Sequence, residues 1–76
     1  EVIEAQVLST SPLSGRRIGQ IGFPEGALVG AVMKKGQFTK PTSMTELEEG
    51  DILVIFALRN DVPVVERLLQ VAVEYF

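Results

Sequence analysis

The chain has 76 residues, a hydrophobic fraction of 46% and a formal net charge of −3, which together describe one small globular domain over residues 1–76. It contains no histidine and no cysteine, so the commonest general base, thiolate metal ligands and disulfides are excluded. The acidic balance and the few aromatic side chains argue against binding to nucleic acid. The longest apolar run, residues 52–58, is far shorter than the roughly 18 residues needed to span a bilayer, so we expect no membrane insertion.

Three segments in the first half of the chain have patterns typical of regular structure. Apolar and polar residues alternate from Val2 to Val7, which predicts a half-buried strand. A short helix, weakened by two glycines, is expected from about Gly15 to Gln20, with Ser14 before it and Gly22 after it. The apolar run Ala27–Met33 predicts a central strand that is buried on both faces.

The second half of the chain predicts a hairpin, a strand and a helix. Lys34-Lys35-Gly36-Gln37 is a hairpin turn, and the return strand Phe38–Lys40 should end at Pro41. A strand is expected at Ile52–Leu58. The last helix should begin near Asp61 and continue to Tyr75 or Phe76, because apolar residues recur there every three or four positions. The predicted order is β-α-β-β-β-α, an α+β fold with a small, mostly antiparallel sheet.

The polar and charged residues of the sequence predict neither a catalytic group nor a metal site. The acidic cluster at positions 46–51 does not match the spacing of a calcium loop, and we interpret it as a solvated turn. Neither of the phosphate-binding motifs G-x-G-x-x-G and G-x-x-x-x-G-K-S/T occurs. Without histidine and cysteine, only a serine activated by a lysine or a carboxylate remains, and no oxyanion motif can be recognised. We therefore predict that the chain is not an enzyme. The basic residues leave two readings open, ordinary surface charge or an anion site where several of them meet.

An ordered set of short motifs resembles the TrkA-C domain, the C-terminal lobe of regulators of potassium conductance. The similarity extends from Val2 to about Leu69, and it is greatest toward the bacterial Trk potassium uptake subunits. Its motifs, in chain order, are Ser11-Pro12-Leu13-x-Gly15-Arg16, Gly26-Ala27-Leu28-Val29-Gly30-Ala31-Val32, Gly36, Pro41, Leu47, Glu49-Gly50-Asp51 and Val54-x-Phe56.

The resemblance implies a cytoplasmic regulatory domain that forms homodimers and acts on a membrane-embedded potassium transporter through a longer protein. Because the sequence opens at Glu1 without an initiator methionine, we expect it to be a piece of that longer chain. In the family, NAD or ATP binds a Rossmann domain that this chain lacks. Some relatives bind cyclic di-AMP between two lobes, and the matching positions here are Leu28, Val29, Lys34, Lys35 and Pro41.

Two other functions share the same resemblance. Anion symporters and cation/proton antiporters carry this module as a cytosolic domain, and the module can also serve purely for dimerisation without a ligand. The apolar residues throughout positions 27–33, together with those of the last helix, exceed what one small core needs, which favours a dimer on physical grounds alone.

Overall fold

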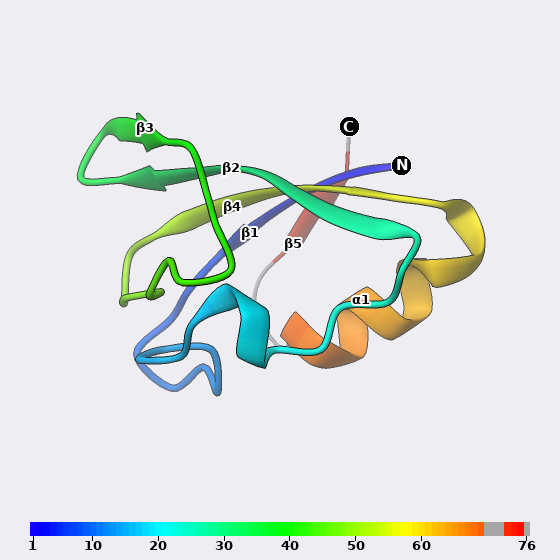
Figure 1. The fold of residues 1–76 in the computed structure, drawn as a ribbon, viewed down its shortest axis with the longest axis horizontal. Coiled ribbons are helices and arrows are strands. Elements are labelled where there is room, and N and C mark those ends of the chain that lie inside the picture. Colours follow the sequence, from blue (N-terminus) through cyan, green and yellow to red (C-terminus); the bar gives the residue numbers. More distant parts are fainter. Residues whose placement is uncertain (70–72, 76) are drawn as a thin grey trace.

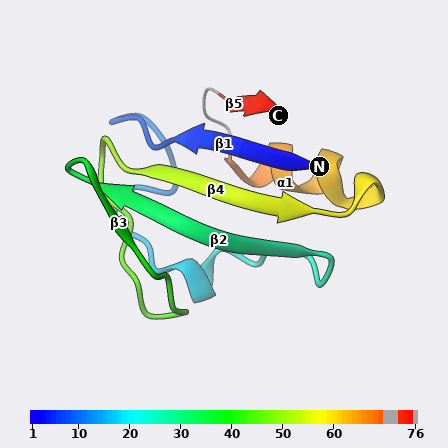
Figure 2. The ribbon, with the colours of Figure 1, turned by 90° about the horizontal axis from the view of Figure 1, so that it is seen from above.

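A computed structural model, which describes residues 1–69 and 73–75, places one five-stranded antiparallel sheet over a layer of helix and loops (Figure 1). The strands lie in the order β3-β2-β4-β1-β5, and Figure 2 shows β4 at the centre. Their bounds are β1 (Val2–Gln6), β2 (Ala27–Lys34), β3 (Gln37–Thr39), β4 (Ile52–Ala57) and β5 (Val73–Tyr75). Within the described residues, no helix is long and apolar enough to cross a bilayer.

The first four strands and their order confirm the α+β prediction, but both predicted helices are shorter than expected. The first is a single 3₁₀ turn, η1 (Ile18–Gln20), because Gly15 takes a positive φ of 82° and interrupts the helical path. The Gln20 side chain closes the turn by accepting a hydrogen bond from the backbone N–H of Arg17 at 3.1 Å, so the predicted cap at Ser14 is wrong.

The C-terminal helix α1 (Val62–Leu69) follows a 3₁₀ turn, η2 (Arg59–Asp61), and does not extend to Tyr75. The chain instead returns as β5, which pairs antiparallel with β1 and places Tyr75 opposite Ile3. Valine and tyrosine favour strands, and the edge of β1 offers backbone partners that a sequence pattern does not reveal. Val71, Ala72 and Phe76, which were also assigned to the helix, lie outside the described residues.

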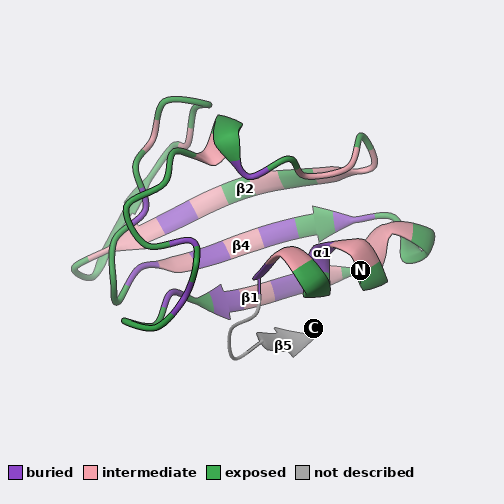
Figure 3. Cartoon of the chain, turned by 90° about the horizontal axis from the view of Figure 1, so that it is seen from below, coloured by how far each residue is buried: buried purple, intermediate pink, exposed green. Residues whose placement is uncertain are grey.

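The core lies between the sheet and the layer beneath it. Buried side chains alternate along β1 and β4 with exposed or half-buried ones, so each strand presents one face to the layer that contains α1 (Figure 3). The core residues are Ile3, Ala5, Val7, Leu13, Ile21, Val32, Leu47, Leu53, Ile55, Ala57, Val65 and Leu69.

The opposite side of the sheet, called here the outer face, carries no covering element among the described residues (Figure 1). Leu28 is 66% exposed and Phe56 is 48% exposed, so the prediction that β2 is buried on both faces is wrong for the single chain. Register and alternation assign these residues to the outer face: Val2, Glu4, Leu28, Ala31, Met33, Phe38, Ile52, Val54 and Phe56.

A β-bulge in β2 places Gly30 beside the ring of Phe56 on the outer face. The β2–β4 register shifts between Val29 and Ala31, which leaves Gly30 as the extra residue. A Cβ at Gly30 would lie 2.4 Å from Cε2 of Phe56, so the aromatic ring can lie against the strand only because this residue is glycine. Gly30 thereby explains the position of one of the two phenylalanine rings on this face.

Candidate functional site

A cleft of about 350 Å³ opens at the free edge of β2 and is called here the edge cleft. Because β3 pairs only with positions 32–34, positions 27–31 of β2 have no neighbouring strand on that side. The cleft occupies this gap, which is closed from below by the segment around η1. Its lining consists of Ile18, Gly19, Gly22, Phe23, Ala27, Leu28, Val29, Pro41, Thr42 and Ser43.

Two walls of the edge cleft come from distant segments that are joined by backbone hydrogen bonds. The N–H of Gly19 donates to the carbonyl of Ser43 at 2.8 Å, and the N–H of Ile18 donates to the carbonyl of Thr45 at 3.0 Å. A Cβ at Gly19 would lie 3.0 Å from both Cβ and O of Ser43, so the close approach depends on glycine. The walls therefore form one unit that faces β2.

The chemistry of the edge cleft suits a flat apolar group. Ile18, Phe23, Leu28 and Val29 supply apolar surface, while Ser43 and its neighbour Thr42 supply hydroxyl groups at the rim. The volume lies near the lower end of the roughly 300–1,000 Å³ typical of ligand sites, which is large enough for one heterocyclic base. Among the described residues, no lysine or arginine belongs to this lining, so the cleft has no positively charged side chain to pair with a phosphate.

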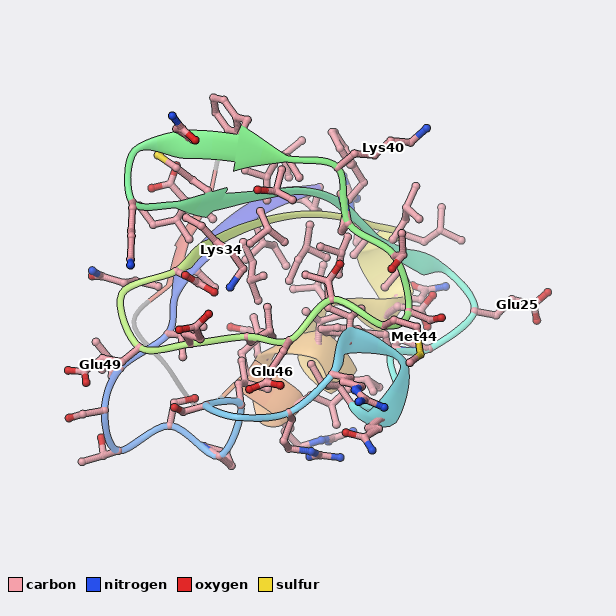
Figure 4. The ribbon with its side chains drawn as sticks, turned by 60° about the vertical axis from the view of Figure 1, so that its left-hand side comes forward. Glu25, Lys34, Lys40, Met44, Glu46 and Glu49 are labelled. Carbon is pink, nitrogen blue, oxygen red and sulfur yellow. The ribbon has the colours of Figure 1, made fainter. Side chains whose placement is uncertain are left out.

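The structure separates the five predicted site residues into two groups. Leu28, Val29 and Pro41 all line the edge cleft. Lys34 and Lys35 instead line a second cleft at the opposite end of β2, together with residues 48–51. Lys34 lies beneath the sheet, whereas Lys40 points away from the domain (Figure 4). The residues around η1 escaped the sequence reasoning because they meet β2 only in the folded chain.

Lys34 is bound to carboxylates rather than free for an anion. Its Nζ donates to Oδ2 of Asp51 and lies 3.4 Å from Oε1 of Glu48. Partial burial by itself lowers the pKa of Lys34, but the hydrogen bond and the charge of Asp51, with those of Glu48, outweigh it and raise the pKa above 10.5. The positive charge of Lys34 therefore serves to hold β2 to the start of β4.

This raised pKa predicts an alkaline loss of stability. Protonated Lys34 stabilises the fold fully below pH 10.5, and the contribution should disappear as the pH rises through the higher pKa of the folded state. Thermal unfolding of the original chain and of Lys34→Met, measured by circular dichroism from pH 7 to 12, should converge above pH 10.5. A difference that stays constant over this range would contradict the assignment.

Comparison with known proteins gives consistent matches over nearly the whole chain. The family model of the TrkA-C domain matches residues 2–70. The Trk system potassium uptake protein TrkA of Azorhizobium caulinodans is 41% identical over 76 residues, covering 100% of this chain and 17% of that protein. TrkA of Haemophilus influenzae is 31% identical over 71 residues, covering 92% of this chain and 16% of that protein. The chain thus spans about a sixth of the length of these relatives.

Solved structures show the same fold at low sequence identity. A structure described as an RCK domain with cda has a TM-score of 0.73 and 18% identity, and the match covers 90% of this chain and 96% of that one. The RCK_C domain dimer of S. agalactiae BusR in complex with c-di-AMP has a TM-score of 0.70 and 22% identity, and the match covers 86% of this chain and 90% of that one.

Proposed function

The chain belongs to the TrkA-C domain family, and from this we propose that it is the regulatory and oligomerisation domain of a Trk-type potassium uptake system. The domain acts in the cytoplasm, forms a homodimer and changes the activity of a membrane-embedded potassium transporter through the longer protein. It does not catalyse a reaction, and NAD or ATP binds a Rossmann domain elsewhere in that protein.

The proposed ligand of the edge cleft is a cyclic dinucleotide, and cyclic di-AMP is the compound with which binding can be tested. The observation that carries the proposal is the edge cleft, whose apolar walls and hydroxyl rim suit an adenine base. Leu28, Val29 and Pro41 are the proposed contacts among the positions matched to the family. The RCK_C domain dimer of S. agalactiae BusR, which has the same fold, is in complex with c-di-AMP, and this supports the choice of probe.

Isothermal titration of the 76-residue chain with cyclic di-AMP tests the proposal. Leu28→Ala should weaken binding about tenfold, because it removes apolar surface from the cleft wall. Met44→Ala is the matched control, since Met44 is similarly exposed at 63% but does not line the cleft. ATP, as a non-cyclic adenine nucleotide, should bind far more weakly than cyclic di-AMP.

The titration also separates the alternatives. No heat and no thermal shift with cyclic di-AMP or ATP would instead support a dimerisation module without a ligand. If Lys35→Gln weakens the binding of cyclic di-AMP and Leu28→Ala does not, the binding site is the cleft beside the hairpin and not the edge cleft. Transmembrane segments elsewhere in the parent chain would assign the domain to an anion symporter or a cation/proton antiporter.

A further inference from the structure

The segment between β3 and β4, residues 40–51 and called here the strap, borders both clefts. Its first part supplies positions 41–43 to the edge cleft, and its last part supplies positions 48–51 to the cleft of about 420 Å³ beside the hairpin. Figure 1 shows the strap descending from β3 to the layer beneath the sheet before the chain returns as β4. The strap forms no helix or strand, so contacts with other segments determine its position.

A series of backbone hydrogen bonds joins the strap to the lower wall of the edge cleft. The bonds from η1 to the strap are described above, and the N–H of Leu47 also donates to the carbonyl of Arg16 at 2.9 Å. The carbonyl of Leu47 accepts from the N–H of Gly15 at 2.8 Å, and the Leu47 side chain is fully buried in the core. Because these bonds follow one another along both segments, the strap and the η1 wall form one unit.

Lys34 holds the other end of the strap to β2. Its ammonium group donates to the Asp51 carboxylate, which also accepts a hydrogen bond from the backbone N–H of Glu48. The N–H of Val7 donates to the carbonyl of Asp51 at 2.8 Å, so the same turn is fixed to the end of β1. Among the residues that the structure describes, both ion pairs between side chains involve Lys34. Lys34 is therefore the charged link between β2 and the strap.

We propose that Lys34 is a positioning residue for the edge cleft, because its bond to Asp51 holds the strap, and with it the η1 wall, at a fixed distance from β2. The inference rests on the proposed function, since it concerns the same cleft and the same ligand. β2 supplies Leu28 and Val29 to one side of the cleft, and the unit of strap and η1 supplies the other side. A movement of the strap relative to β2 thus changes the width of the cleft, although Lys34 does not line it.

The coupling between the edge cleft and Lys34 acts in both directions. A ligand that binds best when the strap is held in turn stabilises the bond between Lys34 and Asp51, because linkage between two sites is reciprocal. Figure 2 shows the turn between β2 and β3 at the end of the sheet away from the N-terminus, whereas the edge cleft lies along positions 27–29 at the other end of β2. Occupancy of the edge cleft is therefore transmitted to the hairpin turn, where a partner can detect it.

Hydrogen exchange followed by NMR tests the coupling without a ligand. In Lys34→Met, the N–H groups of Ile18 and Gly19, which donate to carbonyls of the strap, should exchange about tenfold faster than in the original chain. The reason is that a strap released from β2 opens more often, and each opening breaks these two bonds.

Two controls accompany the exchange measurement. The N–H of Leu58 donates to the carbonyl of Gly26 at 3.0 Å, at the end of β4 remote from Asp51, and its exchange should change less. Glu49→Gln alters an exposed carboxylate in the same turn as Asp51, and it should leave the exchange rates unchanged. Equal acceleration at Leu58 and at Gly19 would show a general loss of stability, and the coupling would then be wrong.

Titration with cyclic di-AMP, at a temperature where circular dichroism shows each variant to be folded, tests the effect on binding. Lys34→Met and Asp51→Asn should each weaken binding about fivefold, which is the lower end of usual couplings between two sites. The two substitutions change the net charge in opposite directions, so attraction of an anion by charge alone does not explain a loss in both. The double variant should lose little more than either single variant, and Lys34→Arg should retain most of the affinity because a guanidinium still pairs with Asp51.

Three results would overturn the inference or the function on which it rests. If Lys34→Met weakens binding and Asp51→Asn strengthens it, Lys34 acts through its charge and not by positioning the strap. If neither substitution changes hydrogen exchange or binding, the strap is not coupled to the edge cleft. If the original chain does not bind cyclic di-AMP, the proposed function fails, and the exchange rates of Ile18 and Gly19 still decide whether Lys34 holds the strap.

Discussion

Replacing Ile55 with alanine should lower the free energy of unfolding by about 2–5 kcal/mol. Ile55 is fully buried at the centre of the sheet, where it pairs with Ile3 on β1 and with Val29 on β2. The substitution leaves a cavity that the surrounding strands cannot close, because they hold one another in register. Domains of this size have little stability to lose, so the variant should be largely unfolded near body temperature.

Val54 provides the matched control on the same strand. It points to the outer face and is half-buried, so Val54→Ala should cost about 1 kcal/mol or less in the monomer. Urea unfolding followed by circular dichroism measures both variants, since the chain has no tryptophan to report by fluorescence. If Ile55→Ala and Val54→Ala lower the free energy of unfolding equally at low protein concentration, the assignment of the two faces is wrong. A loss for Val54→Ala that grows with protein concentration would instead indicate that a second copy covers the outer face.

Asp51→Asn should lower the free energy of unfolding by roughly 2–3 kcal/mol. Asp51 is 5% exposed, and its carboxylate accepts a hydrogen bond from the backbone N–H of Glu48 at 2.9 Å and pairs with Lys34. It thus closes the turn before β4 and ties that turn to β2. Asparagine keeps the shape, but it removes the charge that holds the Lys34 ammonium in its half-buried position.

Two further variants check this explanation for Asp51. Glu49→Gln alters an exposed carboxylate in the same turn and should leave stability within about 0.5 kcal/mol of the original. Lys34→Met combined with Asp51→Asn should cost little more than Asp51→Asn alone, because both changes remove the same interaction. Additive losses, measured by urea unfolding at pH 7, would show that Asp51 stabilises the turn independently of Lys34.

The strands could be predicted from the sequence because their patterns are local. Alternation at positions 2–7 and the apolar runs at 27–33 and 52–58 each mark a strand to within one residue of its observed bounds. The segment at 73–75 fits helical and strand periodicity alike, and pairing with β1 decided between them. The first helix was over-predicted because the pattern did not show that Gly15 takes a positive φ.

The candidate site was predicted only in part. Leu28, Val29 and Pro41 were grouped by the family resemblance, and they line one cleft in the structure. The same resemblance grouped the hairpin lysines with them, yet an eight-residue strand separates its two ends by about 25 Å at the usual rise per residue. The η1 wall, including Gly19, could not be found because backbone pairing with Ser43 brings it there.

The sequence by itself determined the first four strands and the chemical limits of this protein: the strand periodicity, the hairpin turn, and the exclusion of histidine and cysteine chemistry. These properties depend on residue type and on neighbours within a few positions. Only the tertiary structure decided that one face of β2 is uncovered, that Lys34 is bound to Asp51, and that η1 closes the edge cleft. Those outcomes depend on register and on contacts between distant segments, which no local pattern encodes.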